Sequence, residues 1–436
     1  MDIRISIIEY HHRIGLPLGM RLSIKTLFFL LICSLAITYP ATAAVKQGQA
    51  CKKVGITSTS NGLKFTCVKS GKKLVWNKGM PIKKVNPIPA NTPTPAPSPK
   101  VDPSPTPSAT VTPTPTPTPE PIVLPTSFAD LFENRKGISL AAWQKSSEII
   151  KANKSKAGSL EIFTGPNTKP YYDDYPTAVS LVSRLFPGRN EPSRTIVVRF
   201  KYVDLDWAEA TLRSKLSAED FNWLNNTENG KVIQRQCDDR TKNCMGAMQQ
   251  SIFSTGLSII LQGVPNTDNP NDATGKLRFG SGMLEAHEYF HALQRIPIMG
   301  KTDVWPHAWF REGGAEWVQN MAIFYDDYKT YRDYIRLDCF YDCPKLTEAD
   351  IVEFLQTSKE NYFLPKFQQF LNYSLGSRFI EALVAIKGPD GLVGMYAEMG
   401  KKLSFADAFK NVYGVEWSYA IPILAKTIYA NLEEVR

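Results

Sequence analysis

The chain has 436 residues, of which 43% are hydrophobic, and its formal net charge is +9 at pH 7. This length predicts two or three structural units, with at least one sizeable apolar core. The sequence contains no dense basic cluster with interleaved aromatic residues, so we expect no nucleic-acid partner. The modest surplus of basic residues suits a solvated face or a loose attraction to an anionic cell envelope.

The first 44 residues predict an export signal. Arg21 and Lys25 precede an apolar run from residue 27 to residue 37, and the small residues 41–43 suit a cleavage site. The run has about half of the roughly 20 residues that a membrane-spanning helix needs. We therefore expect cleavage at residue 43 or 44, with Met20 as an alternative start. The mature protein would be secreted or associated with the cell envelope, without a membrane span.

The cysteines suit an exported protein. Without Cys33, which lies in the apolar run, they form three sequence-local pairs: Cys51 and Cys67, Cys237 and Cys244, Cys339 and Cys343. An even set of cysteines in an exported chain predicts disulfide bonds. Zinc ligation is the alternative, and the absence of a C-x-x-C motif weakens it. Because six cysteines allow 15 connectivities, local pairing is a hypothesis.

Residues 45–86 predict a small, disulfide-stapled, β-rich module. The dipeptide Asn61-Gly62 precedes an alternating stretch from residue 63 to residue 68, and this arrangement is a hairpin signal. Residues 71–76 supply a further strand. The segment resembles short Cys-containing modules of secreted actinobacterial proteins. We expect a folded spacer, with contact to the cell envelope as the alternative.

Residues 87–125 predict a linker, because proline alternates there with Thr or Ser. Proline fixes φ and lacks an N–H group, so the segment forms neither a helix nor a sheet ladder. At about 3.1 Å per residue, an extended chain of this kind spans roughly 120 Å. The linker separates the small module from residues 126–436.

Residues 126–436 predict an α+β domain, in which a small mixed sheet is followed by a mostly helical half. Runs of β-branched residues indicate strands, and a helical period indicates helices. The predicted strands are 160–163, 195–200 and 256–261, the first predicted helices are 206–216 and 218–224, and the pattern is mostly helical from residue 281. We interpret the strand at 256–261 as an edge strand that aligns an extended peptide by β-addition.

His287 begins an H-E-x-x-H motif that ends at His291. Residues 282–295 have helical character, and side chains four positions apart share one face of a helix. Two imidazoles at this spacing can hold one zinc ion, and Glu288 can then take a proton from a zinc-bound water. After residue 44 the only other histidine is His307. The structural alternative is a buried helix with two core histidines.

A catalytic zinc ion needs a third protein ligand, and the segment from Trp309 to Trp317 offers two carboxylates. Glu312 and Glu316 share one helix face, so one can bind zinc while the other orients a ligand histidine. We expect Pro306 in the first turn of this helix and Asp303 as its cap. The glycines at 313–314 are unfavourable inside a helix, and a close approach to the first helix would compensate. The structural alternative is an ordinary acidic helix face.

These motifs together resemble the gluzincins, zinc metallopeptidases with thermolysin-like catalytic domains, and especially their aminopeptidase N-like branch. His287 to His291 is followed by W-F-R-E-G-G-A-E-W, which resembles the E-G-x-A helix of that branch. The resemblance implies that Glu312 is the third ligand and that Glu316 supports the site. The spacing from His291 to Glu312 is slightly longer than usual, which a loop insertion would absorb. The metzincin pattern is absent.

A second part of the resemblance lies downstream. Tyr373-Ser374-Leu375-Gly376 resembles the family's Y-x-x-G segment, which implies that the Tyr373 hydroxyl stabilises the oxyanion of the tetrahedral intermediate. The alternative is a structural tyrosine. The runs that follow resemble the helical tail of secreted gluzincin-like proteins; they cover residues 379–383, 388–392 and 405–413.

One departure from the family concerns the substrate. Residues 246–250 faintly resemble the G-x-M-E-N segment that binds a free amino terminus, but Gln249 replaces the carboxylate. An amide cannot pair ionically with an ammonium group, so we do not expect an aminopeptidase. His307 could donate to the oxyanion, and the alternative that we prefer is a surface or capping role.

The sequence therefore predicts a secreted zinc metallopeptidase with one zinc ion bound by His287, His291 and Glu312. Glu288 would be the general base, Tyr373 the oxyanion donor, and a peptide or protein the substrate. Two alternatives stay open. One is an inactive metal-binding protein of the cell envelope, and the other is a zinc hydrolase that acts on non-peptide or cell-wall amides.

Overall fold

A computed structural model of the protein describes residues 48–51, 57–60, 63–70, 73–78, 80–81, 121–189, 191–227, 230–266, 278–301, 305–339, 343–357 and 366–433. The expected export signal and most of the expected linker lie outside these residues. The chain divides into two compact units, which we describe separately. The first contains the described residues up to Pro81, and the second contains those from residue 121 onward.

The small unit is a sheet of four short strands: β1 (Thr57–Ser60), β2 (Leu63–Ser70), β3 (Lys73–Trp76) and β4 (Met80–Pro81). Strand β2 pairs antiparallel with each of the others. Ser60 lies opposite Leu63, which is the register that a two-residue hairpin connection requires. Cys51 forms a disulfide with the buried Cys67. A unit with so small an interior depends on such a bond.

The large unit contains a mixed sheet in the order β5-β6-β10-β9. Its strands are β5 (Ser159–Thr164), β6 (Arg194–Phe200), β9 (Ala247–Ile252) and β10 (Leu257–Gly263). Strands β5, β6 and β10 run parallel, and β9 runs antiparallel to β10. The strands predicted at 160–163, 195–200 and 256–261 are confirmed. The edge position expected for 256–261 is wrong, because β10 is hydrogen-bonded on both sides; within the described residues the edge strands are β5 and β9.

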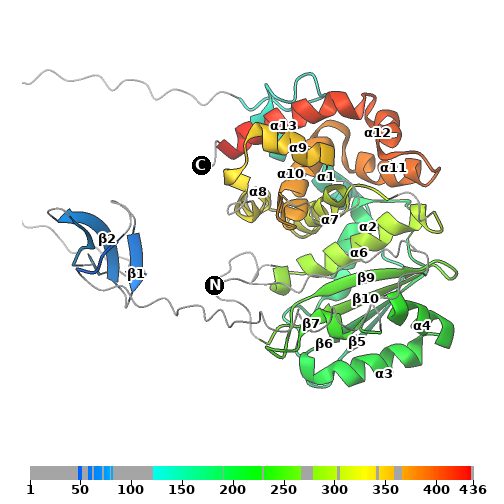
Figure 1. The fold of residues 1–436 in the computed structure, drawn as a ribbon. Coiled ribbons are helices and arrows are strands. Elements are labelled where there is room, and N and C mark those ends of the chain that lie inside the picture. Colours follow the sequence, from blue (N-terminus) through cyan, green and yellow to red (C-terminus); the bar gives the residue numbers. More distant parts are fainter. Residues whose placement is uncertain are drawn as a thin grey trace, which may run out of the picture. The chain divides into compact units, whose positions relative to one another are not determined.

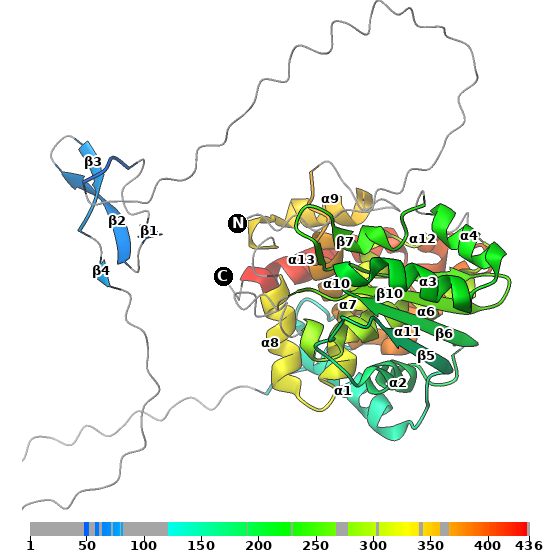
Figure 2. The same cartoon turned by 90° about the horizontal axis from the view of Figure 1, so that it is seen from below.

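Alternate residues of β6 and β10 face two different apolar cores. Val197 and Ile260 belong to the core of the helical half. Their neighbours Ile196, Val198 and Ile259 belong to a second core, which α3 (Leu205–Lys215) and α4 (Ala218–Thr227) close on the other face of the sheet (Figure 2). Because side chains alternate along a strand, a strand buried on both faces is apolar at successive positions. This requirement explains the continuous apolar run in β6.

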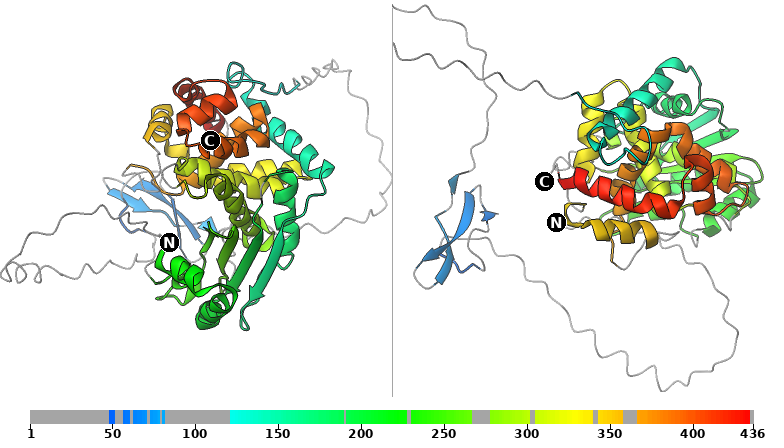
Figure 3. Two further views of the ribbon diagram at one scale, coloured as in Figure 1. Left: turned by 90° about the vertical axis from the view of Figure 1, so that its right-hand side faces the viewer. Right: turned by 90° about the horizontal axis from the view of Figure 1, so that it is seen from above.

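The helical half lies on the opposite side of the sheet from α3 and α4 (Figures 1 and 3). Helix α6 runs along the sheet beside β9, and the other helices pack beyond it (Figure 1). Fully buried aromatic side chains such as Trp309 and Trp317 fill the interior of the helical half. The helices are α1 (Ile138–Ala152), α2 (Tyr175–Leu185), α6 (Met283–Arg295), α7 (Ala308–Ile323), α8 (Tyr328–Asp338), α9 (Glu348–Thr357), α10 (Leu371–Lys387), α11 (Pro389–Met399), α12 (Phe405–Tyr413) and α13 (Trp417–Glu433).

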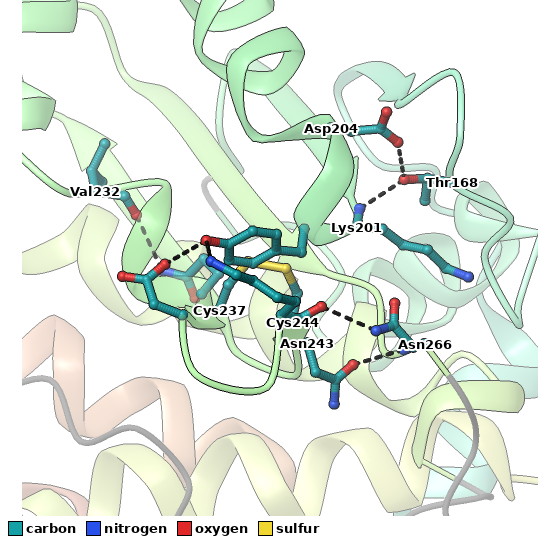
Figure 4. The surroundings of a disulfide bond; sticks show 12 residues. Thr168, Lys201, Asp204, Val232, Cys237, Asn243, Cys244 and Asn266 are labelled. Carbon is teal, nitrogen blue, oxygen red and sulfur yellow. Dashed lines mark hydrogen bonds between the residues drawn. A yellow bond between two sulfur atoms is a disulfide. The ribbon is translucent and has the colours of Figure 1, made fainter.

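Two further disulfides close short segments of the large unit. Cys237 in β7 (Cys237–Asp238) bonds to Cys244 in β8 (Asn243–Cys244), and Cys339 bonds to Cys343 after α8. The backbone N–H of Asn266 donates to Asn243 Oδ1 at 2.8 Å, which ties the β7–β8 turn to the chain that follows β10 (Figure 4). Local pairing of the cysteines is thus confirmed, and zinc ligation by these cysteines is wrong. The disulfides fit an extracytoplasmic location.

The part of the chain that the structure describes holds no helix that is both long and apolar enough to span a bilayer.

Candidate metal centre

Helix α6 brings the two motif histidines to one face. It begins after Gly282, whose φ of 93° suits glycine and whose added Cβ would lie 2.8 Å from the Tyr172 ring. The ring centroids of His287 and His291 are 4.9 Å apart. His287 is 2% exposed, and Glu288 between the two histidines is 6% exposed. A buried helix thus presents two imidazoles and a carboxyl group to one small space.

Helix α7 supplies the third ligand candidate. Glu312 Oε2 lies 3.8 Å from His287 Nε2 and 3.4 Å from His291 Nε2. Four ligands at about 2.05 Å around a tetrahedral zinc ion lie about 3.3 Å from one another. Two of the three separations are therefore close to this value, all three donor atoms lie within 4.8 Å of one another, and these residues could hold a metal ion.

Polar groups lie on the far side of both imidazoles. Glu316 Oε2 lies 3.6 Å from His287 Nδ1 and 3.6 Å from Arg278 Nη1. His291 Nδ1 lies 2.7 Å from Gln294 Oε1, and the Gln294 side chain also donates to the Arg311 carbonyl at 2.9 Å. A hydrogen bond such as that between His291 and Gln294 fixes the ring orientation of a ligand histidine. Gln294 was not among the residues expected at the site, although its position one helical turn after His291 could have indicated it.

Burial sets the protonation of the centre in its metal-free form. It lowers the pKa of His287 to about 3, so this imidazole is neutral and able to bind a cation. It also raises the pKa of Glu288 to about 7, where a carboxyl group can accept and release a proton at neutral pH. For Glu312 burial acts in the same upward direction, but His291, His287 and Arg311 together hold its pKa well below the usual range.

Two glycines let α7 and α10 approach closely. A Cβ added to Gly313 would lie 2.3 Å from the backbone carbon of Gly376, and one added to Gly376 would lie 2.6 Å from the Trp309 carbonyl oxygen. A Cβ added to Gly314 would instead lie 3.1 Å from Gln294 Nε2 on α6. The expected approach to the first helix is therefore correct for Gly314 and wrong for Gly313, which contacts α10.

The contact between α7 and α10 places Tyr373 beside the candidate metal ligands. Tyr373 lies one helical turn before Gly376 in α10, and its ring stacks on His287 with 6.0 Å between the centroids and 16° between the planes. The side chain is half-buried. The structure thus brings together all the residues that the sequence analysis selected for the site: His287, Glu288, His291, Glu312, Glu316 and Tyr373.

His307 lies apart from this group. It is the residue directly before α7, and its ring stacks on Phe405 with 4.1 Å between the centroids. Since α7 begins at Ala308, the expectation that Pro306 lies in its first turn is wrong. Asp303, the expected cap, lies outside the described residues. His307 joins the aromatic packing between α7 and α12.

The segment that faintly resembles an amino-terminus-binding motif forms the edge strand β9. Its Gln249 is 3% exposed and donates to Ser258 Oγ at 2.9 Å. The neighbouring Gln250 accepts a hydrogen bond from Arg295 of α6 at 2.7 Å. Gln249 is therefore held within the sheet, while β9 as a whole lies along α6, the helix that carries the histidines.

A comparison of this chain with the models of known protein families, with curated proteins and with solved structures finds no match.

Proposed function

We propose that this protein is an extracytoplasmic zinc-dependent metallopeptidase of the gluzincin type. The observation that carries the proposal is the position of Glu312, whose Oε2 lies 3.4 Å and 3.8 Å from the two imidazole nitrogens. Glu288, between the two histidines in the sequence, provides a carboxyl group that is not one of the three ligand candidates. A purely structural metal site is closed by four protein ligands, whereas a catalytic site keeps one position open. The cluster among the described residues has three such ligands.

The residues of the centre then have separate roles. When bound, a zinc ion would lower the pKa of a coordinated water to about 7 and polarise a substrate carbonyl. Glu288 accepts the proton of the attacking water and passes it to the departing amine, which its raised pKa favours. Tyr373 donates a hydrogen bond to the oxyanion. Glu316 and Gln294 hold His287 and His291 in position.

The edge strand favours a peptide over another amide. Within the described residues, β9 pairs with β10 on one side only and lies along α6. An extended peptide that adds to such an edge forms backbone hydrogen bonds and places its own carbonyl groups near the centre. A compact cell-wall fragment would not use this edge.

Two variants of the full-length chain test the proposal. Elemental analysis should find about one zinc ion per chain in the wild type and in Glu288→Gln, and none in His291→Ala. Glu288→Gln should lose at least about 1,000-fold in kcat on a peptide substrate, because the proton acceptor is removed while the ligands remain. Retained turnover in Glu288→Gln would overturn the mechanism.

The same measurements separate the alternatives. Zinc binding without cleavage of any peptide or cell-wall fragment would favour an inactive metal-binding protein. Cleavage of wall fragments alone would favour the non-peptide hydrolase. A wild-type chain that binds no zinc after reconstitution would leave the histidine helix as a structural element.

A further inference from the structure

A pair of arginines, Arg295 and Arg311, lies next to the centre. The Cζ atoms of Arg295 and Arg311 are 5.9 Å and 5.7 Å from the ring centroid of Trp305. Arg295 also donates to Gln250 Oε1 in the edge strand β9 at 2.7 Å. The arginine pair thus joins α6, α7 and the edge strand around one aromatic ring. Planar guanidinium groups held against a ring lose little freedom when they bind a ligand.

The arginine pair lies at the carboxyl end of α6, on the side of this helix that carries Glu288 and His291. Arg295 follows Glu288 by seven positions and His291 by four, so the three side chains share one face of the helix. Arg311 directly precedes the ligand candidate Glu312, and its Nε lies 3.9 Å from Glu312 Oε1. At 1.5 Å per residue, Arg295 is about 10 Å along the helix from Glu288. That distance corresponds to about three residues of an extended peptide.

The charges at this end of the centre favour an anion. Within the described residues, Arg295 acts on Glu288 and Arg311 lies near Glu312, and a bound divalent cation would add two positive charges to this end of the centre. Arg311 is 14% exposed at its side chain, so its charge acts in a poorly solvated space. Electrostatic attraction of a ligand is stronger in such a space than on a solvent-exposed surface. Guanidinium groups bind carboxylates with two parallel hydrogen bonds.

We propose that the arginine pair forms a subsite for a carboxylate group of the peptide substrate, two or three residues from the bond that is cleaved. The proposal rests on the proposed function, because it assigns a substrate preference to the same centre. The carboxylate could belong to an acidic side chain or to the carboxyl terminus of the peptide. The structural alternative is that the three side chains only pack α6 against α7.

Matched quenched-fluorescence peptides test the subsite. One series places Glu or Gln at each position up to three residues from the cleaved bond, and a second ends two or three residues beyond it as a free acid or an amide. In the wild type we expect about a 10-fold higher kcat/KM for the charged member at one position, the typical effect of a charge-assisted hydrogen bond. The side-chain series and the terminus series distinguish the two sources of the carboxylate.

Variants show whether the arginine pair causes this preference. In the double variant Arg295→Gln/Arg311→Gln, the ratio of kcat/KM for the charged peptide to that for the neutral peptide should fall to about 1. Arg295→Lys should keep part of the preference, because a lysine retains the charge. Arg213→Gln is the matched control, since Arg213 also lies over an aromatic ring, Phe221, but on α3 across the sheet. The ratio in this control should equal that of the wild type.

Binding gives a readout that does not need turnover. In a Glu288→Gln background, fluorescence anisotropy should show tighter binding of the charged peptide, and the arginine substitutions should abolish the difference. Zinc-dependent cleavage of Gln peptides with no preference for Glu or a free terminus would overturn the subsite and leave the proposed function intact. Equal binding of charged and neutral peptides would overturn it even if no peptide were cleaved.

Discussion

The helices α6, α7 and α10 differ from the layer formed by α3 and α4 in what they bury. In the first region the buried side chains include ionisable groups: Glu285, His287, Glu288, Glu312 and Glu316. In the second, the buried residues of α3 and α4 are all apolar, and the charged Glu209 and Arg213 remain near the surface. Burying charge opposes folding unless partners compensate. The first region therefore buries charge that the proposed metal ion would help to compensate, whereas the second buries only apolar side chains of α3 and α4.

The largest effect should follow from separating α7 and α10. Gly376→Ala would press a methyl group against the Trp309 carbonyl and Gly313, so we expect a loss of about 3 kcal/mol in the free energy of unfolding. Zinc affinity should fall as well, because α7 would shift and move Glu312 relative to the two histidines of α6. Urea unfolding and zinc titration measure the two quantities. As a control, Gly394→Ala in α11, whose added Cβ would meet only Val412 at 3.6 Å, should change stability far less.

The second region should respond in stability alone. Leu212 of α3 is fully buried in the core that α3 and α4 share with the sheet. Leu212→Ala should lower the free energy of unfolding by about 2 to 3 kcal/mol through lost burial and the cavity that remains. Under conditions where the variant is folded, its zinc affinity should match the wild type. A large drop in zinc affinity would show that the two regions are coupled across the sheet.

A smaller effect is expected at Glu316. Glu316→Gln keeps the size of the side chain but removes the charge beside His287 Nδ1. Loss of such a supporting carboxylate typically weakens metal binding about 10- to 100-fold. Competition with a zinc chelator measures this change. Affinity equal to that of the wild type would show that Glu316 has only a packing role.

The smallest effect concerns a surface cap outside both regions. Asp350 Oδ2 accepts a hydrogen bond from the Thr347 backbone, and the Asp350 backbone donates to Thr347 Oγ1, which is a capping box for α9. Lys366 and then Thr347 lower the pKa of Asp350 to about 2. Asp350→Asn should cost about 1 kcal/mol of stability at neutral pH.

The pH dependence of this cost has a definite sign. A carboxyl group whose pKa is lowered by folding stabilises the folded state above its ordinary pKa, and this contribution is lost as the pH falls toward about 2. The difference between wild type and Asp350→Asn should therefore be constant from pH 7 down to about pH 5 and shrink below pH 4. Thermal unfolding across this range checks it. A difference that grows toward acid would contradict the assignment.

Much of the fold followed from local patterns. The run Thr195 to Phe200 predicts a strand because successive β-branched residues suit a strand buried on both faces. The helix that carries the H-E-x-x-H motif and the pairing of each cysteine with its nearest neighbour followed in the same way. Strand β9 did not, because three consecutive residues in the middle of 247–252 are polar and only pairing with β10 makes the segment a strand.

For the candidate site, the sequence by itself determined the donor atoms and their spacing along each helix. The i, i+4 period of a helix places His287 beside His291 and Glu312 beside Glu316 whatever the rest of the chain does. Only the tertiary structure decided that Glu312 turns toward both imidazoles, that Tyr373 stacks on His287, and that β9 is an edge strand beside α6. Those arrangements depend on contacts between residues far apart in the chain, such as Gly313 with Gly376, and local periodicity carries no information about which helix faces which.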